Sequence, residues 1–207
     1  MKKQLIVFML TIAVITIVFV SCEKEKISRN IVAENVQNSN DAIDFVEAFI
    51  LSDKDLPPLA DADYDDHSFK LTLPKSVSDE YLEGEKNGKT GMLVLVAFDE
   101  NENEMGNFFW FDNNKKIQAS YVYANKEVVA KGKLDTSPPQ TWDCSFSKGW
   151  NIIYAEAKGD ETYVSSKKPS NLSLLWYFKP KNTQQTNINS YINSEHLIDL
   201  MKNLSKM

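Results

Sequence analysis

Ser68-Phe-Lys-Leu-Thr-Leu-Pro74 is the stretch at which the chain adopts a regular alternation of apolar and polar residues. Phe69, Leu71 and Leu73 would share one side of an extended segment, which predicts a strand with one apolar face that Pro74 ends. Segments with strand-like composition and short turns between them follow as far as residue 179. The predicted strands are 68–73, 91–99, 104–111, 116–124, 127–134, 141–147, 150–158, 161–165 and 172–179.

The connections between these segments are short and contain residues that tolerate a positive φ, such as Gly159-Asp160 and Lys148-Gly149. Connections of this kind are typical of hairpins between antiparallel strands. We therefore predict that residues 68–180 form a mainly β domain, an antiparallel β-sandwich of about eight or nine strands, with a closed β-barrel as the alternative. Alternation also predicts which side chains of 141–147 point inward: Trp142, Cys144 and Phe146.

The segments that flank this region have other patterns. In residues 39–67, Ser39 or Asn40 precedes apolar residues at helical spacing up to Leu51, which predicts a short helix, although a strand over 43–49 fits as well. An acidic loop with two prolines follows over 53–67. Residues 181–207 are predicted to form a polar linker and a C-terminal amphipathic helix that contains Leu197 and Leu204.

The N-terminal segment has the layout of a secretory signal peptide over residues 1–21. Lys2 and Lys3 precede an apolar run, and Ser21 stands directly before Cys22. The junction 19–22 resembles a bacterial lipobox, which implies that Cys22 is lipidated, with palmitate among its acyl chains, and becomes the mature N-terminus. The alternative is an uncleaved signal anchor with a free cysteine. Residues 22–38 show no sustained period and are interpreted as a flexible tether behind this lipid anchor.

The net charge and the cysteine content limit which partners the chain can bind and how its fold is stabilised. The chain has 23 basic and 29 acidic residues and a net charge of −6, which becomes −8 without residues 1–21 and their two lysines. Such an acidic body is not expected to bind nucleic acid. The chain has two cysteines. If Cys22 is acylated, Cys144 has no partner, so the fold must be held together by packing.

Several phrases in the predicted β region resemble those of one group of proteins. They include Phe108-Phe109-Trp110-Phe111, Lys148-Gly149-Trp150-Asn151 and Leu175-Trp176-Tyr177-Phe178. Their order and spacing resemble uncharacterised small Bacteroidota lipoproteins, which have a β-rich module with a Lys-Gly-Trp-Asn turn and a C-terminal Trp-Tyr-Phe strand. The charged residues that follow Cys22 also look like the export signals of surface lipoproteins in that phylum. The resemblance implies an outer-membrane lipoprotein at the cell surface or on the periplasmic face, and implies no catalytic residues.

Sites of metal or catalytic chemistry are sparse in this sequence. Asp61, Asp63 and Asp65 have the spacing with which a calcium loop begins, but the glycine and the glutamate that complete such a loop are absent, so they predict at most a weak calcium site. His67 and His196 are far apart in sequence, and no nucleophile or phosphate-binding motif occurs. We predict no metal, no cofactor and no enzymatic activity.

Aromatic residues give the strongest functional hint. Phe108 to Phe111 place large rings on both faces of one predicted strand, and Phe109 and Phe111 form a candidate aromatic binding surface. The leading hypothesis is a non-enzymatic, membrane-attached module that binds a glycan or a protein partner. The alternatives are a β-barrel carrier of an apolar small molecule and a hydrolase that uses two carboxylates. A void of several hundred Å³ would favour the carrier, whereas a solid core with exposed phenylalanines would favour the surface.

Overall fold

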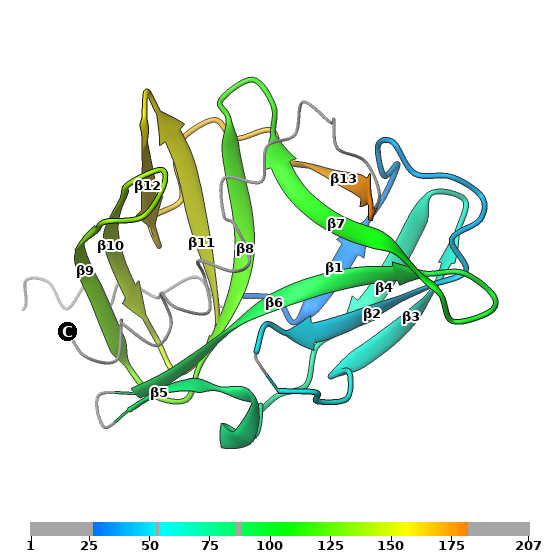
Figure 1. Cartoon of the computed structure of the whole chain (residues 1–207), viewed down its shortest axis with the longest axis horizontal. Helices are drawn as coiled ribbons and strands as arrows, with labels where there is room; N and C mark the ends of the chain where they lie inside the picture. The colour runs from blue at the N-terminus through cyan, green and yellow to red at the C-terminus, as the bar shows by residue number, and fades with distance from the viewer. Residues whose placement is uncertain (1–26, 53, 86–87, 182–207) are drawn as a thin grey trace, which may run out of the picture.

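The computed structural model describes residues 27–52, 54–85 and 88–181, in which thirteen strands form one large mixed sheet (Figure 1). The strands are β1 (Asn30–Ala33), β2 (Phe45–Ile50), β3 (Ala60–Asp65), β4 (Ser68–Thr72), β5 (Glu83–Glu85), β6 (Gly88–Phe98), β7 (Glu104–Asp112), β8 (Ile117–Ala124), β9 (Val128–Leu134), β10 (Gln140–Phe146), β11 (Gly149–Lys158), β12 (Glu161–Ser165) and β13 (Leu175–Pro180). The only helical element within these ranges is the 3₁₀ turn η1 (Asp79–Tyr81). None of the described residues forms a helix of the length and apolarity needed to cross a membrane.

The strand order shows that the sheet is not closed. It runs β1-β4-β3-β2-β6-β7-β8-β11-β12-β10-β9, with β13 paired to β7 and β5 paired to β6. The β10–β12 pair is parallel, and the other pairs in the described part are antiparallel. The prediction of a mainly β fold is confirmed. The predicted antiparallel β-sandwich is not what forms, because the strands make one continuous sheet in which β10 and β12 are parallel. The closed barrel is wrong as well, because β1 and β9 end the path without meeting.

The nine strands predicted between residues 68 and 179 are all present, with bounds that differ by a few residues. Trp142, Cys144 and Phe146 point into the interior as predicted, with exposed fractions of 3%, 0% and 2%. Gly149 and Gly159 lie in the turns where they were expected, both with positive φ. Period-2 alternation and turn chemistry therefore found nine strands of this region, whereas the three-residue strand β5 (Glu83–Glu85) was not predicted.

Two main hydrophobic cores lie on opposite faces of the sheet. The first core is built mostly from β1–β4, β6–β8 and β13, and it includes Ile31, Val46, Leu71, Leu95, Phe108, Tyr121, Trp150, Trp176 and Phe178. The second core is built from β8–β12 with the start of β6, and it includes Met92, Val122, Val128, Ala130, Trp142, Cys144, Phe146, Ile153, Ala155 and Val164.

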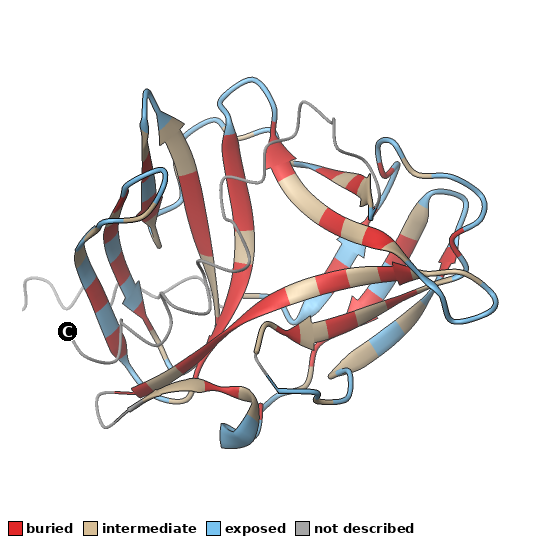
Figure 2. Cartoon of the chain, in the orientation of Figure 1, coloured by how far each residue is buried: buried red, intermediate tan, exposed pale blue. Residues whose placement is uncertain are grey.

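The central strands contribute to both cores at once. On β8, Tyr121 belongs to the first core and its neighbour Val122 to the second, and on β6 Leu93 and Met92 divide in the same way. Successive side chains of a strand point to opposite faces, so the sheet must fold toward one face at its β1–β4 end and toward the other at its β9–β12 end. Figure 2 shows the resulting burial along β8. Nearly continuous apolar runs, such as residues 92–98, follow from burial on both faces.

The predictions for residues 39–67 have a mixed outcome. The helix over 39–51 is wrong, and the alternative strand over 43–49 is confirmed as β2, in which Val46, Ala48 and Ile50 are buried and the residues between them are half-buried. Its aromatic and β-branched residues favour a strand, and the segment fits both the helical period of 3.6 and the strand period of 2. Pairing with β3 and β6 stabilises the strand. The expected acidic loop contains strand β3, whose aspartates lie on the exposed side.

The predicted tether over 22–38 is also shorter than expected. Strand β1 begins at Asn30 and pairs with β4, and Ile31 and Val36 are buried in the first core. Residues 30–65 therefore belong to the same sheet as the predicted domain of 68–180. The predicted signal peptide, Cys22, the polar linker from residue 182 and the C-terminal helix with His196 lie outside the described residues.

Candidate functional site

The candidate site lies where three neighbouring strands part. Strand β6 pairs with β8 through residues 90–92 and with β7 through residues 95–98, whereas β7 pairs with β8 only from Trp110 onward. Between these pairings, Leu93 and Val94 of β6 and Ser120 and Tyr121 of β8 have no partner across the gap. In Figure 1 the three strands form the sides of a triangle.

Main-chain polar groups therefore face this opening. The N–H and C=O groups of consecutive residues in a strand point to opposite edges, so one residue of the pair 93–94 and one of the pair 120–121 must direct both groups into the gap. Buried groups of this kind are normally satisfied by a neighbouring strand or by a ligand or water. The parting of the strands thus provides hydrogen-bonding groups without any special side chain.

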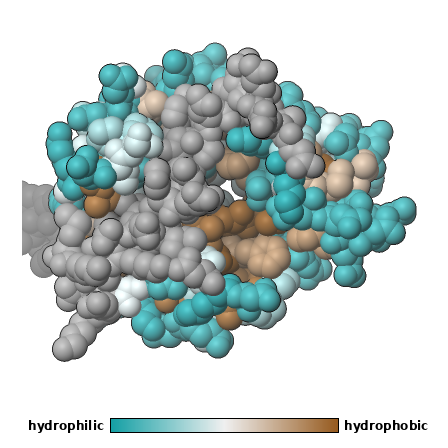
Figure 3. All heavy atoms as spheres, in the orientation of Figure 1, coloured by the Kyte–Doolittle hydropathy of each residue, from teal (hydrophilic) through white to brown (hydrophobic). Residues whose placement is uncertain are grey.

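A pocket of about 890 Å³ occupies the opening and the concave side of the sheet next to it. Its volume is in the range of small-molecule sites. Figure 3 shows apolar residues gathered at a hollow in this face of the molecule, with hydrophilic residues around it. The lining includes Met92 and Val94 from β6, Asn107, Phe109 and Trp110 from β7, Gln118, Ser120 and Tyr121 from β8, Gln140 from β10, Thr162 from β12 and Lys179 from β13.

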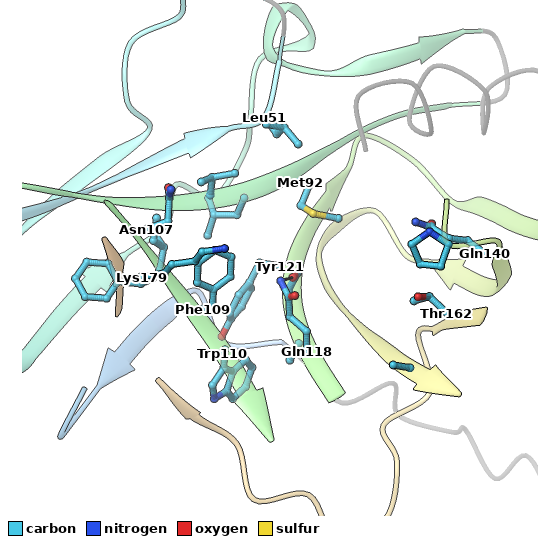
Figure 4. Close-up of a pocket in the computed structure, with 18 of the residues that line it drawn as sticks. Leu51, Met92, Asn107, Phe109, Trp110, Gln118, Tyr121, Gln140, Thr162 and Lys179 are labelled. Carbon is cyan, nitrogen blue, oxygen red and sulfur yellow. Dashed lines mark hydrogen bonds between the residues drawn. The ribbon is translucent and has the colours of Figure 1, made fainter. Parts of the chain in front are cut away.

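Two buried amides, one near the middle of the pocket and one at an end, are part of its lining. Gln118 is 7% exposed, and its Nε2 atom lies 3.5 Å from the Ser120 Oγ atom, which is a long and weak contact. Gln140 is 4% exposed, and its Oε1 atom accepts a hydrogen bond of 3.0 Å from the Trp142 Nε1–H group. Figure 4 shows Gln118 near the middle of the pocket and Gln140 beside Thr162 at one end. Because Gln140 uses its oxygen for Trp142, its amide N–H groups are the part offered to the pocket.

Stacked aromatic rings form another wall. Trp110 lies between two rings: its centroid is 6.1 Å from that of Tyr121 and 5.7 Å from that of Trp176, with interplanar angles of 15° and 8°. Burial, together with the nearby Tyr154, raises the pKa of Tyr121, so its hydroxyl is neutral. These residues belong to the first core or pack against it, yet they also line the pocket. The opening between the strands therefore gives the pocket access to an aromatic surface on the other face of the sheet.

The predicted aromatic surface of Phe109 and Phe111 is divided by the structure. Phe109 is half-buried and lines the pocket, next to Tyr177 in the β7–β13 ladder. Phe111 is 3% exposed and packs edge-on against Tyr177 at 6.3 Å. The exposed two-ring platform is therefore wrong, because strand β13 and its side chains cover Phe111. Sequence reasoning identified Phe109, but nothing in the sequence indicated that Gln118 and Gln140 would line the same pocket.

The fold brings together Ser39, His67 and Asp41, a combination not expected from their spacing. The Ser39 Oγ atom lies 2.7 Å from His67 Nδ1, and His67 Nε2 lies 3.8 Å from Asp41 Oδ1. The residue types are those of a hydrolytic triad. However, the Ser39 hydroxyl donates to the Val36 carbonyl at 3.0 Å, so it accepts from the imidazole instead of giving up its proton to it. The Asp41 side chain is fully exposed. This cluster fastens residues 36–41 to the turn before β4.

The acidic candidates do not form a metal site. Asp61, Asp63 and Asp65 lie along the exposed side of strand β3. Alternate residues of a strand are about 6.6 Å apart, so they cannot wrap around one calcium ion as a loop does. Elsewhere in the described ranges, no group of three histidine, cysteine or acidic residues could hold a metal. Glu47 lies opposite Asp61 in the β2–β3 ladder, and desolvation, Asp61 and Glu102 together raise its pKa.

Cys144 is a buried thiol of the second core. Burial raises its pKa to about 12, and the Sγ atom lies 3.7 Å from the Val164 carbonyl oxygen. A thiol with so high a pKa is almost entirely protonated at neutral pH and therefore a poor nucleophile.

Comparisons with models of protein families, with curated proteins and with solved structures gave no significant match.

Proposed function

We propose that this protein is a non-enzymatic binding module that takes a small amphipathic molecule into the pocket between β6, β7, β8, β10 and β12. The observation that supports this proposal is the composition of the pocket wall. Aromatic and aliphatic side chains line one part, and two buried amides, Gln118 and Gln140, face the other. A ligand with an apolar body and hydrogen-bonding groups would satisfy both.

A purely apolar ligand fits this pocket poorly. It would displace water from Gln118, from the amide N–H groups of Gln140 and from main-chain groups at the opening, and it would offer them no hydrogen bond. Each polar group left unpaired in this way costs about 1–3 kcal/mol. The ligand must therefore supply acceptors near Gln140 and either acceptors or donors near Gln118.

A glycan is the second candidate, and Phe109 is the observation that favours it. Its ring lines the pocket on the same face of β7 as the Asn107 amide, so an aromatic ring and a hydrogen-bonding group lie on one wall. A sugar presents C–H groups on one face and hydroxyls around its edge, and stacking with hydrogen bonds would satisfy both.

The position of the module in the cell is part of the proposal. A lipidated Cys22 would attach the protein to the outer membrane, since two or more acyl chains give stable anchoring. Strand β1 begins at Asn30. The seven residues from Glu23 to Arg29 reach at most about 24 Å, so the pocket would be held close to the membrane surface. Such a position suits capture of amphipathic molecules or glycans near that surface.

The binding proposal can be tested with a neutral fluorescent probe. N-phenyl-1-naphthylamine should bind the purified full-length protein with increased fluorescence, and an amphipathic ligand or an oligosaccharide should displace it. Ala157→Phe, which adds a ring inside the pocket, should reduce probe binding about tenfold or more. Ala42→Phe places the same ring at an exposed site outside the pocket and is the matched control. Equal probe binding by both variants and the parent would refute a ligand site in this pocket.

The anchor has its own test. In cells supplied with a labelled palmitate analogue, the parent protein should incorporate the label and fractionate with membranes. Cys22→Ser should abolish both. Label incorporation that is unchanged in Cys22→Ser would show that this cysteine is not the attachment site.

A further inference from the structure

Lys179 places a cation at one end of the pocket. In the β13–β7 ladder, Lys179 stands directly opposite Asn107, and Tyr177 stands opposite Phe109. Directly opposite residues of an antiparallel pair lie on the same face of the sheet, so the ammonium, the amide and the ring all belong to the pocket side. Figure 4 shows Lys179 beside Phe109 and Asn107, away from the end that holds Gln140 and Thr162.

No carboxylate of the described residues pairs with this lysine. Lys181, two residues further on, lines the same pocket but is joined to Glu104. The acids of the pocket are Asp160, in the β11–β12 turn, and Glu161, the first residue of β12, and both precede Thr162. The Glu161 carboxylate has partners of its own: Oε1 lies 3.6 Å from Lys133 Nζ, and Oε2 accepts a hydrogen bond of 2.9 Å from the Tyr163 hydroxyl.

The pocket is therefore polarised along its length. Its β13 end has an ammonium that no carboxylate of the described residues pairs with, its middle has aromatic rings and the Gln118 amide, and its far end has the Gln140 amide, the Thr162 hydroxyl and two acids. In a protein with a net charge of −6, a cation of this kind within a pocket is a specific attraction for an anion. The acids at the far end would repel the same anion and so fix its orientation.

We propose that the ligand of this pocket is a hydroxylated carboxylic acid, whose carboxylate lies at Lys179 and Asn107 and whose hydroxyl groups lie at Gln140 and Thr162. This inference rests on the proposed binding function and names the chemical class of its ligand. The Lys179 ammonium and the Asn107 amide donate to the carboxylate, and the Gln140 amide N–H groups donate to a hydroxyl oxygen. Two sources share this chemistry: amphipathic acids with a rigid apolar body, and sugar acids.

Matched pairs of an acid and its neutral ester test the charge without changing the body of the ligand. Cholate with methyl cholate represents the amphipathic source, and trigalacturonate with its methyl ester represents the sugar source. Isothermal titration of the full-length protein should give a Kd for one acid that is about 10-fold lower than that of its ester. The pair that shows the difference identifies the source.

Lys179→Met keeps a long apolar stem and removes the charge, so the difference between acid and ester should disappear while binding of the ester stays within about twofold. Lys168→Met removes an exposed charge outside the pocket and should leave the difference intact. Circular dichroism and Tm of both variants would establish that they fold.

The outcomes separate the inference from the function on which it rests. Tight binding of an ester and its acid with equal Kd would overturn the inference and leave the small-molecule function standing. A preference for the acid that persists in Lys179→Met would also overturn it, since another group would then hold the carboxylate. If none of the four compounds binds, the inference is again overturned, and displacement of the neutral probe then decides the proposed function by itself.

Discussion

The first and second cores fill their space with different side chains. In the first core, the rings of Tyr64, Phe69, Phe108, Trp176 and Phe178 contact one another, with centroid separations of 5.1–6.4 Å. The second core has Trp142 and Phe146 as its aromatic members, and much of the rest is alanine, valine and one cysteine. The two faces of the sheet are therefore filled by side chains of different size.

The difference explains where the pocket lies. Tyr121 and Trp176 of the first core and Met92 of the second all line it, so the pocket occupies the boundary at which the sheet changes the direction of its curvature. At that boundary β7 leaves β6 before it joins β8, and neither core fills the gap. A sheet that curves toward both faces can therefore have a pocket where the curvature changes direction, without closing into a barrel.

The largest loss of stability is expected when an aromatic ring of the first core is removed. Phe178 is 0% exposed, and its ring centroid lies 5.5 Å from that of Phe108. Phe178→Ala should lower the free energy of unfolding in urea by about 3–5 kcal/mol, because it removes the ring and leaves a cavity. Leu175 lies on the same strand and is 46% exposed, so Leu175→Ala should change the free energy of unfolding by no more than about 0.5 kcal/mol. A cost below 1 kcal/mol for Phe178→Ala would show that the first core is not tightly packed.

A smaller loss of stability is expected from the hydrogen bond that links the second core to the pocket. Trp142→Phe removes the indole N–H that donates to Gln140 Oε1, so it should cost about 1–3 kcal/mol in the same urea experiment. Trp142→Phe combined with Gln140→Leu removes both partners and should cost less than the sum of the two single changes. Additive costs would mean that the hydrogen bond contributes nothing to stability.

The third prediction concerns how stability depends on pH through Cys144 of the second core. Burial raises the pKa of Cys144 from 9.0 to about 12, so the unfolded chain loses the thiol proton at lower pH than the folded one. The stabilisation is complete below pH 9 and is lost as the pH rises toward 12, with a fall of about 1 kcal/mol by pH 10. Cys144→Ala should flatten this part of the stability curve. An unchanged slope in the variant would assign the loss to other groups.

The smallest effect lies on the face of β2 that points away from the first core. Glu47 stands opposite Asp61, and desolvation with the charge of Asp61 raises its pKa above 4.5. A raised pKa means that the ionised carboxylate opposes folding, so Glu47→Gln should stabilise the protein at pH 7 by about 0.3 kcal/mol. This gain should vanish near pH 3, where the carboxyl is protonated in both states. Destabilisation at pH 7 would show that Glu47 has a favourable partner.

The fold was predictable wherever local patterns are strong. Residues 127–134 and 141–147 alternate cleanly and both are strands, and 141–147 has the expected inward face. Residues 45–50 satisfied both a helical and an extended pattern, and long-range pairing with β6 decided the outcome. The acidic composition of 60–65 suggested a loop, although one side of a sheet edge tolerates charge.

The candidate site was predictable only in part. Phe109 was identified from its aromatic neighbours, whereas Gln118 and Gln140 are ordinary glutamines in sequence, 22 positions apart, and acquire meaning because both are buried at one pocket. The site is set by the register of β7 against β6 and β8, which depends on pairings between residues far apart in the chain.

Alternation and glycine conformations act over a few residues, so the amino-acid sequence was enough to place most strands and turns between residues 68 and 180 and to show the apolar character of their faces. The packing of distant strands decided which apolar face joined which core, since residues such as Tyr121 and Val122 are both apolar and the pattern does not rank them. It also decided that the three central strands part and leave a pocket, because that depends on the volumes of side chains brought together from distant strands.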